Sequence, residues 1–287
     1  MNGFVLINKP SGLTSFKVTG SVKRKSGEKR CGHAGTLDPL ATGVLPVMIG
    51  RATRLIDLID DNRKTYIASL VLGLATDTLD CDGEVLIDQP VNVTKQEFES
   101  VLEEFKGEIT QIPPMYSALS KDGVKLYKLA RQGVEVERKP RKATVYKIEL
   151  LEFDGKDNAK ILVECSKGTY IRTIIDDIGV KLKCGAFMNE LQRIKASGFS
   201  LHECISLDEF LQKDISQTII PADKAVESFC AVYVTDNQAL RFKNGNELDL
   251  NRLNIKEKSL YYRVYCKDEF LGLGEIKENS LKPKVVF

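Results

Sequence analysis

The chain has 287 residues, of which 43% are hydrophobic and 29% are charged, and its formal net charge is +2. This is the composition of a soluble globular protein with one substantial core and room for a second, smaller one. The apolar runs at 4–7 and 44–49 are too short to span a bilayer. We expect neither a leader segment nor a membrane association, and we therefore expect a cytoplasmic location.

The cysteines exclude two further classes of protein. Seven are scattered along the chain without a Cys-x-x-Cys pair, which argues against both a disulfide framework and a zinc site. Because His33 and His202 are the only histidines, nitrogen ligands are also scarce. We expect no metal.

Short strands and helices alternate through most of the chain. We predict strands at 4–8, 44–49, 65–72, 145–153 and 160–165, and helices at 14–25, after 94, at 126–131 and from about 169. Pro46 within the apolar run indicates a buried edge strand or a strand start. Thr94 and Glu97 have the spacing of a capping box, and the helix that they begin is expected to be broken off at the Pro113-Pro114 pair.

The pattern changes after Pro221 to short segments separated by turns, such as the one at 243–246. This predicts a small β-rich domain from about Ala231 to the end. We therefore divide the chain into a domain at 1–228 and a second at 229–287.

Asp38 lies in a stretch, 31–46, that holds three glycines and two prolines. Pro39 biases Asp38 toward an extended or turn backbone, and the glycines permit a positive φ or a close approach. The stretch therefore predicts a rigid loop that presents one carboxylate. Taken alone, the local pattern favours an ordinary type I turn.

Other polar groups have ordinary explanations as well. Tyr66 is typical of a strand tyrosine, and Arg172 has the spacing of a helix salt bridge to Asp176. The basic stretches at 23–30 and 138–142 are usually solvated surface, although near a site they would contact phosphates. A calcium loop fails because Gln89 stands where a bidentate glutamate belongs. Phosphate-loop, dinucleotide and serine-hydrolase signatures do not occur in the sequence.

Six motifs taken together and in order closely resemble the bacterial tRNA pseudouridine synthase B family. They are Asn8-Lys9-Pro10-x-Gly12-x-Thr14-Ser15, Gly32-His33-x-Gly35-Thr36-Leu37-Asp38-Pro39-Leu40-Ala41-Thr42-Gly43, Lys64-x-Tyr66, Thr76-Asp77-Thr78-x-Asp80-x-Asp82-Gly83, Ile112-Pro113-Pro114-Met115-Tyr116-Ser117-Ala118 and Cys165-Ser166-Lys167-Gly168-Thr169-Tyr170-Ile171-Arg172. The stretch at 242–245 and the Leu271-Gly272-Leu273-Gly274-Glu275 segment are similar to a PUA RNA-binding domain. The resemblance extends along nearly the whole chain.

The resemblance implies an α/β (α+β) pseudouridine synthase fold with a mixed, largely antiparallel central sheet, followed by a small C-terminal PUA domain. It implies that uridine 55 in the T arm of tRNA is flipped out and isomerised to pseudouridine. No cofactor is expected. The implied partner is the T-arm stem-loop of tRNA, without a guide RNA, and the implied state is a monomer.

The family's site residues carry over by position. Asp38 matches the nucleophile, Arg172 its charge partner, Asp80 an acid of the same network, Tyr66 the tyrosine that stacks on the flipped base, His33 the histidine that enters the T loop, and Tyr170 and Leu191 substrate-contacting positions. The chain departs from the family at Gln192 and Arg54, where arginine and lysine are common. Whether Asp38 attacks the ribose, attacks the uracil ring or removes a sugar proton stays open.

Three alternatives to a stand-alone synthase remain from other classes. One is an RNA-binding or tRNA-folding protein in which catalysis is secondary. Another is the catalytic subunit of a guide-RNA-dependent synthase, although the long charged tails usual there are missing. A carboxylate glycosidase is the third, and it lacks a second acid with a defensible placement.

Overall fold

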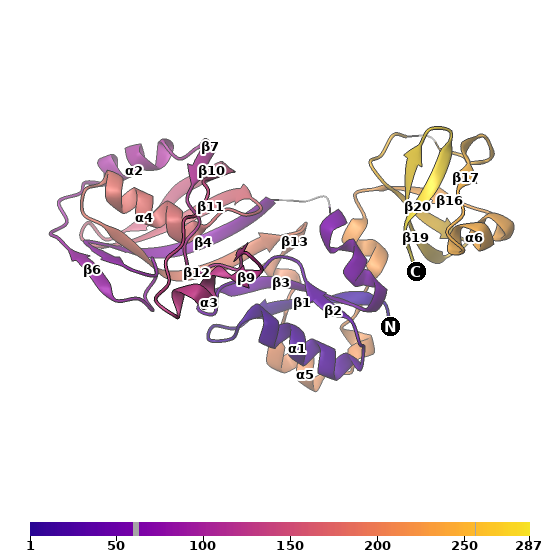
Figure 1. Ribbon diagram of the computed structural model, residues 1–287, viewed down its shortest axis with the longest axis horizontal. Helices are drawn as coiled ribbons and strands as arrows, with labels where there is room; N and C mark the ends of the chain where they lie inside the picture. The colour runs from indigo at the N-terminus through magenta and orange to yellow at the C-terminus, as the bar shows by residue number, and fades with distance from the viewer. Residues whose placement is uncertain (60–62, 256) are drawn as a thin grey trace.

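The computed structural model describes residues 1–59, 63–255 and 257–287. A large sheet with its helices forms one part of the molecule, and a small β-rich part follows at the C-terminal end (Figure 1). The fold expected from the sequence, a mixed α/β protein with a small C-terminal sheet, is confirmed.

The main sheet is built, among the described residues, from eleven strands. They are β1 (Gly3–Lys9), β2 (Cys31–His33), β3 (Thr42–Ile49), β4 (Arg63–Leu72), β7 (Gly107–Gln111), β10 (Arg141–Phe153), β11 (Asn158–Ser166), β12 (Ala186–Ala196), β13 (Phe199–Ser200), β14 (Ile205–Ser206) and β15 (Ile220–Pro221). Their order is β14-β1-β3-β12-β4-β11-β10-β7, with β2, β13 and β15 alongside. The β1–β14 and β3–β12 pairs are parallel and the other pairs are antiparallel, so the sheet is mixed and largely antiparallel, as expected.

The helices cover the sheet on separate regions (Figure 1). They are α1 (Ser15–Ser26), α2 (Lys95–Glu103), α3 (Leu126–Ala130), α4 (Ile171–Lys181) and α5 (Leu207–Gln212), with 3₁₀ turns η1 (Gly50–Leu58), η2 (Leu201–Glu203), η3 (Ile215–Gln217) and η4 (Ala222–Val226). Phe98 on α2 and Ile174 on α4 enter the cluster formed by β4, β10, β11 and β12. Thr94 and Glu97 form the predicted capping box of α2.

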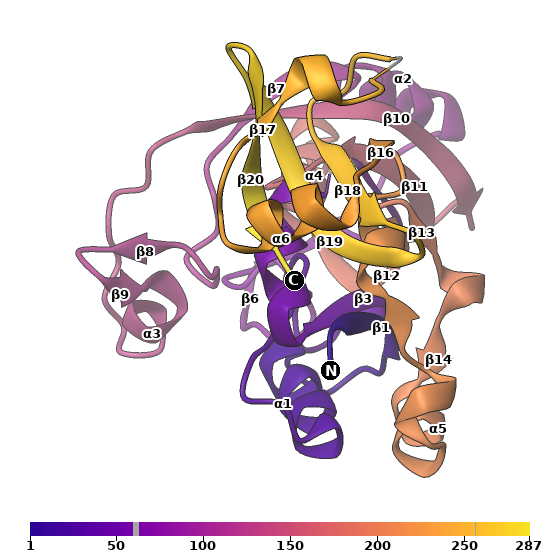
Figure 2. The same cartoon turned by 90° about the vertical axis from the view of Figure 1, so that its right-hand side faces the viewer.

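Two small hairpins stand apart from the main sheet. One pairs β5 (Leu74–Thr76) with β6 (Val85–Asp88), and the other pairs β8 (Ser120–Lys121) with β9 (Val124–Lys125). The second hairpin and α3 form an arm that projects away from the sheet, as Figure 2 shows.

The C-terminal sheet has the order β16-β18-β19-β20-β17. Its strands are β16 (Cys230–Tyr233), β17 (Leu248–Asp249), β18 (Tyr262–Cys266), β19 (Glu269–Lys277) and β20 (Ser280–Val286), and it carries α6 (Asp236–Lys243) and η5 (Leu250–Arg252). Leu273 and Val285 of this sheet share a hydrophobic cluster with Phe4 and Leu55 of the main body. The two parts are therefore packed together rather than merely linked.

Two predictions differ from the structure, and one central strand was not predicted. The run at 44–49 was predicted to be an edge strand or a strand start, and both alternatives are wrong. The strand β3 already begins at Thr42, and it pairs with β1 on one side and with β2 and β12 on the other. Pro46 is tolerated there because its nitrogen, which has no proton to donate, faces the gap between the β12 pairs at 42–43 and the β2 pairs at 47–49. Its carbonyl faces the same side and accepts from the Ala34 amide at 3.0 Å.

The helix that begins after Thr94 ends at Glu103, well before the proline pair, and β7 occupies part of the interval. The central strand β12 was not predicted at all. Bulges near residues 189 and 194 shift its register twice, which removes the alternation of apolar and polar residues that identifies a strand.

Candidate active site

The loop that carries Asp38 is fixed at several points by backbone contacts. The Ala41 amide donates to the Asp38 carbonyl at 3.1 Å, so the predicted turn is present. The Ser15 hydroxyl, at the start of α1, donates to the Leu37 carbonyl at 3.0 Å and accepts from the Leu37 amide at 2.8 Å. The turn and the rigid loop are thus one structure, from which the half-buried Asp38 side chain, 33% exposed, projects.

Lys9 is fully buried and ties the loop to the end of β1. Its ammonium group donates to the carbonyls of Pro10 at 2.8 Å, Leu13 at 2.6 Å and Pro39 at 3.0 Å. Burial lowers the pKa of Lys9 to about 8, while nearby Asp38 opposes this shift. Lys9, which the sequence analysis placed only within a motif, therefore holds the Asp38 loop against the end of β1.

Arg172 lies in the first turn of α4 and binds Asp38 directly. Its Nη2 is 3.0 Å from Asp38 Oδ2 and also donates to the Tyr116 carbonyl at 2.8 Å. Its Nη1 lies 3.3 Å from Asp80 Oδ2 and donates to the Thr78 carbonyl at 3.2 Å. This pairing replaces the local bridge to Asp176 that the helix spacing suggested.

Asp80 is buried behind this pair. It accepts from the Thr78 hydroxyl at 2.6 Å and from the Asp82 amide at 3.2 Å. Burial raises the pKa of Asp80, whereas the Thr78 hydrogen bond and the Arg172 charge oppose the rise. Asp77, by contrast, accepts from the Glu84 amide and serves as a turn residue.

Tyr66 lies in the centre of the sheet beside the Asp38 loop. Backbone pairing places Gly43 of β3, Arg193 of β12 and Tyr66 of β4 in one row across three strands. Burial raises the pKa of Tyr66 to about 12, with Arg193 opposing the rise. Tyr66 is therefore a neutral phenol at physiological pH.

Arg193 is fully buried and closes the Asp38 loop at its base. Nη2 donates to the carbonyls of Gly35 at 3.0 Å and Val44 at 2.6 Å, and Nε also donates to Val44 at 2.8 Å. Gly35 and Val44 flank the segment 36–43, so one guanidinium joins both ends of the loop. Sequence reasoning missed Arg193, although it follows Leu191 closely.

The other predicted site residues surround this centre. His33 contacts the hydroxyls of Thr19 at 3.1 Å and Thr36 at 3.2 Å, and burial lowers the pKa of its imidazole. Tyr170 precedes α4, and its amide and carbonyl both bind the side chain of Gln111 at 3.1 Å. Leu191 is buried in β12 within the main core.

The structure thus brings Asp38, Arg172 and Asp80 into direct contact, with Tyr66 and Tyr170 close enough to be affected by the Asp38 charge. Among the described residues, no three metal-ligating side chains come together, and no helix is long and apolar enough to cross a membrane. The chemistry available is that of a carboxylate paired with an arginine, beside a buried, neutral phenol.

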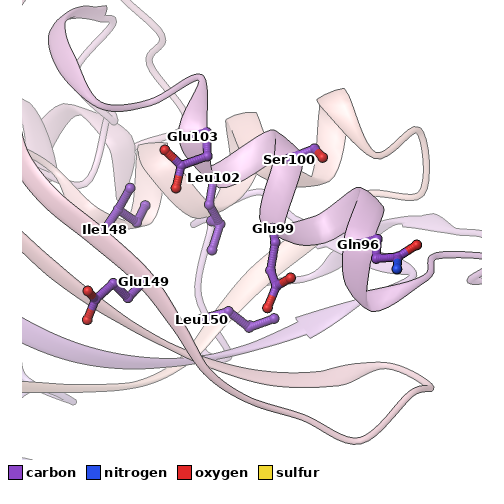
Figure 3. Close-up of a pocket in the computed structure, with 8 residues that line it drawn as sticks. All are labelled: Gln96, Glu99, Ser100, Leu102, Glu103, Ile148, Glu149 and Leu150. Atoms are coloured by element: carbon purple, nitrogen blue, oxygen red, sulfur yellow. The ribbon is translucent and has the colours of Figure 1, made fainter.

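A groove that is separate from this centre lies between α2 and β10 (Figure 3). Its volume is about 540 Å³, and it is lined by Gln96, Glu99, Ser100, Leu102, Glu103, Ile148, Glu149 and Leu150. None of the predicted site residues lines it. Its three carboxylates are each paired with a lysine: Glu99 with Lys95, Glu103 with Lys106 and Glu149 with Lys147.

Comparison with known families gives matches along most of the chain. The model of the TruB family pseudouridylate synthase N-terminal domain matches residues 23–171. The tRNA pseudouridylate synthase B C-terminal domain matches 172–227, and the model described as pseudouridine synthase II TruB, C-terminal, matches 230–287.

Similar proteins and structures agree with these models. The tRNA pseudouridine synthase B of Clostridium perfringens is 44% identical over 98% of this chain and 97% of its own length, and that of Clostridium tetani is 43% identical over 98% of each. A crystal structure of a Cbf5-Nop10-Gar1 complex contains a chain with a TM-score of 0.74 and 28% identity, covering 99% of this chain and 84% of that one. An H/ACA RNP bound to a substrate RNA gives a TM-score of 0.73 at 27% identity over the same shares.

Proposed function

Because the chain belongs to the TruB family of pseudouridylate synthases, we propose that it isomerises uridine 55 in the T arm of tRNA to pseudouridine. The observation that supports this most directly is the Asp38–Arg172–Asp80 network at the end of a rigid loop. A half-exposed carboxylate that is held by a buried guanidinium is suited to attack a bound nucleoside.

The reaction is a rearrangement that consumes nothing. The bond between uracil N1 and ribose C1′ breaks, uracil turns over, and a bond between uracil C5 and C1′ forms. C5 loses its proton and N1 gains one, so atoms and electrons balance without a cofactor. The protein must flip the base out of the loop, at a cost of about a few kcal/mol, and hold it while it turns.

Asp38 supplies the carboxylate, and Arg172 holds it in place through the ion pair, since the guanidinium is itself fixed by two backbone carbonyls. An ionised aspartate serves attack on the ribose and attack on the ring equally. Tyr66 presents a neutral aromatic ring beside this carboxylate, against which a flipped base would stack. His33, Tyr170 and Leu191 complete the proposed substrate-binding group.

The proposed partner is the T-arm stem-loop of tRNA, bound by a monomer without a guide RNA. We assign residues 1–228 to catalysis and 229–287 to a PUA-like domain that binds RNA. The five-stranded C-terminal sheet and its family match support the second assignment. A tRNA substrate is consistent with activity in the cytoplasm.

The direct test is Asp38→Asn assayed on an unmodified tRNA transcript. We expect pseudouridine formation to fall by at least about 10³-fold, because the nucleophile is lost while the substrate surface is kept. Binding of the transcript and the free energy of unfolding should change little, since Asp38 is partly exposed and Arg172 retains Asp80 and two carbonyls.

Mapping the modified position in the same reaction tests the substrate assignment. Wild-type protein should modify position 55 alone, with no added RNA, and a transcript with cytidine at that position should stay unmodified. An active Asp38→Asn variant would contradict the role of Asp38. Modification only when a guide RNA is added would favour the guide-dependent alternative.

A further inference from the structure

Lys64 and Arg193 converge on one face of Gly35, at the edge of the Asp38 loop. A Cβ built on Gly35 would lie 2.9 Å from Lys64 Nζ and 3.3 Å from Arg193 Nη1. Gly35 has a φ of 83°, in the left-handed region that favours glycine. Because Gly35 has no side chain, both cationic groups approach its backbone closely.

No anion in the described part of the chain neutralises this pair. Lys64 Nζ has neither a carboxylate nor a hydrogen-bond acceptor among those residues. The partners of Arg193 are two backbone carbonyls and the Tyr66 hydroxyl, which are all neutral. Arg193 Nη1 is buried without any described partner. A buried donor left unpaired in this way costs free energy, so a ligand that supplies an acceptor is favoured.

The groups around Lys64 reinforce the excess of positive charge. Burial lowers the pKa of Lys64 to about 8, and Arg193 and Lys167 lower it further, while Cys165 acts in the opposite direction. Burial raises the pKa of the Cys165 thiol to about 11, so this group is neutral at pH 7. An anion bound here would restore the pKa of Lys64 toward its ordinary value.

We propose that Lys64 and Arg193 form a subsite for one phosphodiester of the RNA substrate, next to the flipped nucleotide. This inference rests on the proposed function. Lys64 and Tyr66 are two residues apart on β4 and share a face, so their positions are separated by about 7 Å. That separation is of the order of one nucleotide, which lets the base meet Tyr66 while its backbone meets Lys64.

The two cations would act differently. The half-buried Lys64 would approach the phosphate, as an ammonium does in many phosphate sites. Arg193 is fixed by its hydrogen bonds to Gly35 and Val44, and its buried Nη1 would add positive electrostatic potential at the phosphate from the protein side. In this arrangement the guanidinium that closes the catalytic loop also attracts the substrate backbone toward it.

The first experiment measures tRNA affinity against salt for Lys64→Met, Lys64→Gln and Lys64→Arg. Loss of one phosphate contact should reduce the slope of log Kd against log salt by about one, and weaken binding by about fivefold to tenfold at low salt. Lys64→Arg should keep the wild-type slope. Lys156→Met is the matched control, because Lys156 is exposed before the opposite end of β11 and should leave the slope unchanged.

The second experiment places single neutral methylphosphonate linkages along a T-arm stem-loop. One linkage next to the target uridine should weaken binding to wild-type protein but have no further effect on Lys64→Met, because both changes remove the same contact. Inorganic phosphate added in excess should compete weakly and only with wild type. Thermal melting confirms that each variant is folded, and the two neutral variants serve as checks on each other.

The inference is overturned if the neutral Lys64 variants keep the wild-type salt slope, or if every methylphosphonate costs them as much as it costs wild-type protein. Failure of the proposed function gives a different result, namely no pseudouridine from wild-type protein on any tRNA. Wild-type activity together with unchanged Lys64 variants therefore rejects the phosphate subsite alone.

Discussion

Arg172 is the residue on which the site depends most. It is almost fully buried, and its two terminal nitrogens contact two carboxylates and two backbone carbonyls. These partners come from three separate parts of the chain, since Thr78 and Asp80 belong to the same turn. One side chain thereby determines the direction of Asp38 and compensates the buried charge of Asp80.

Replacing Arg172 by Met should destabilise the protein by about 3–5 kcal/mol, because Asp80 would lose its partner inside the protein. Urea unfolding at pH 7 measures this change. Arg252→Met is the matched control, since Arg252 is 79% exposed and lies 3.8 Å from Asp249, and it should cost less than about 0.5 kcal/mol. If both variants lost the same free energy of unfolding, the buried network would contribute no more to stability than an exposed ion pair does.

Among the secondary-structure elements, the parallel pairing of β3 with β12 fixes the position of the Asp38 loop. Gly43 pairs with Arg193 and has a φ of 105°. A Cβ at Gly43 would lie 2.2 Å from the Arg193 carbonyl oxygen, which is backbone and cannot swing aside. Only glycine allows the two strands to approach this closely.

Gly43→Ala should therefore cost about 3 kcal/mol or more and should also reduce activity, because the clash displaces the base of the Asp38 loop. Gly155→Ala is the control, since Gly155 also has a positive φ but has open space around it. Its cost should be limited to the backbone strain, about 1 kcal/mol. Calorimetric melting of both variants measures the difference, and similar losses would reject the clash.

Helix α4 carries an acid whose ionisation opposes folding. Burial raises the pKa of Asp177 to about 6, Asp176 raises it further, and Lys181 opposes the rise. Between about pH 4 and pH 6, Asp177 is therefore protonated in the folded state but has released its proton in the unfolded state. The stability that this residue contributes is complete below pH 4 and is lost as the pH rises through 6.

Asp177→Asn should remove that loss. The free energy of unfolding of the variant minus that of wild-type protein should be more positive at pH 7.5 than at pH 4.5. Urea midpoints of both proteins at the two pH values measure this difference. A stability difference that is the same at both pH values would contradict the raised pKa. Circular dichroism at each pH checks that both proteins start from the native fold.

At the scale of the whole molecule, a shared hydrophobic cluster joins the two sheets. Leu273 and Val285 pack with Phe4 and Ala52, and the Tyr265 hydroxyl donates to Asp223 at 2.8 Å across the same boundary. Such packing makes the two parts fold as one cooperative unit.

We expect a single unfolding transition for wild-type protein in calorimetry. Leu273→Ala should destabilise it by about 2–5 kcal/mol, because Leu273 is fully buried in the cluster. Leu240→Ala on α6 is the control, since Leu240 is 64% exposed and its loss should cost less than about 0.5 kcal/mol. Two separated transitions in wild-type protein would show that the parts unfold independently.

The sequence alone determined the fold class, four of the helices, five of the longer strands of the main sheet, and the residues of the central network. Caps, apolar periodicity and turn residues act over a few positions, so Thr94 and the Asp38-Pro39 turn could be identified locally. The resemblance of six ordered motifs added Arg172 and Asp80, which lie far from Asp38 in the chain.

Tertiary structure alone decided what brings these parts together. Two bulges in β12 remove its periodic pattern, so neither the strand nor the role of Arg193 could be predicted. The hydrogen bonds of Arg193 to Gly35 and Val44 depend on the pairing of β3 with β12. Lys9 and Gln111 likewise act on backbone groups distant in sequence. A local pattern depends only on residues that are near one another in the chain. The acceptor of a buried donor depends on packing between distant segments, so only the folded molecule shows which acceptor it is.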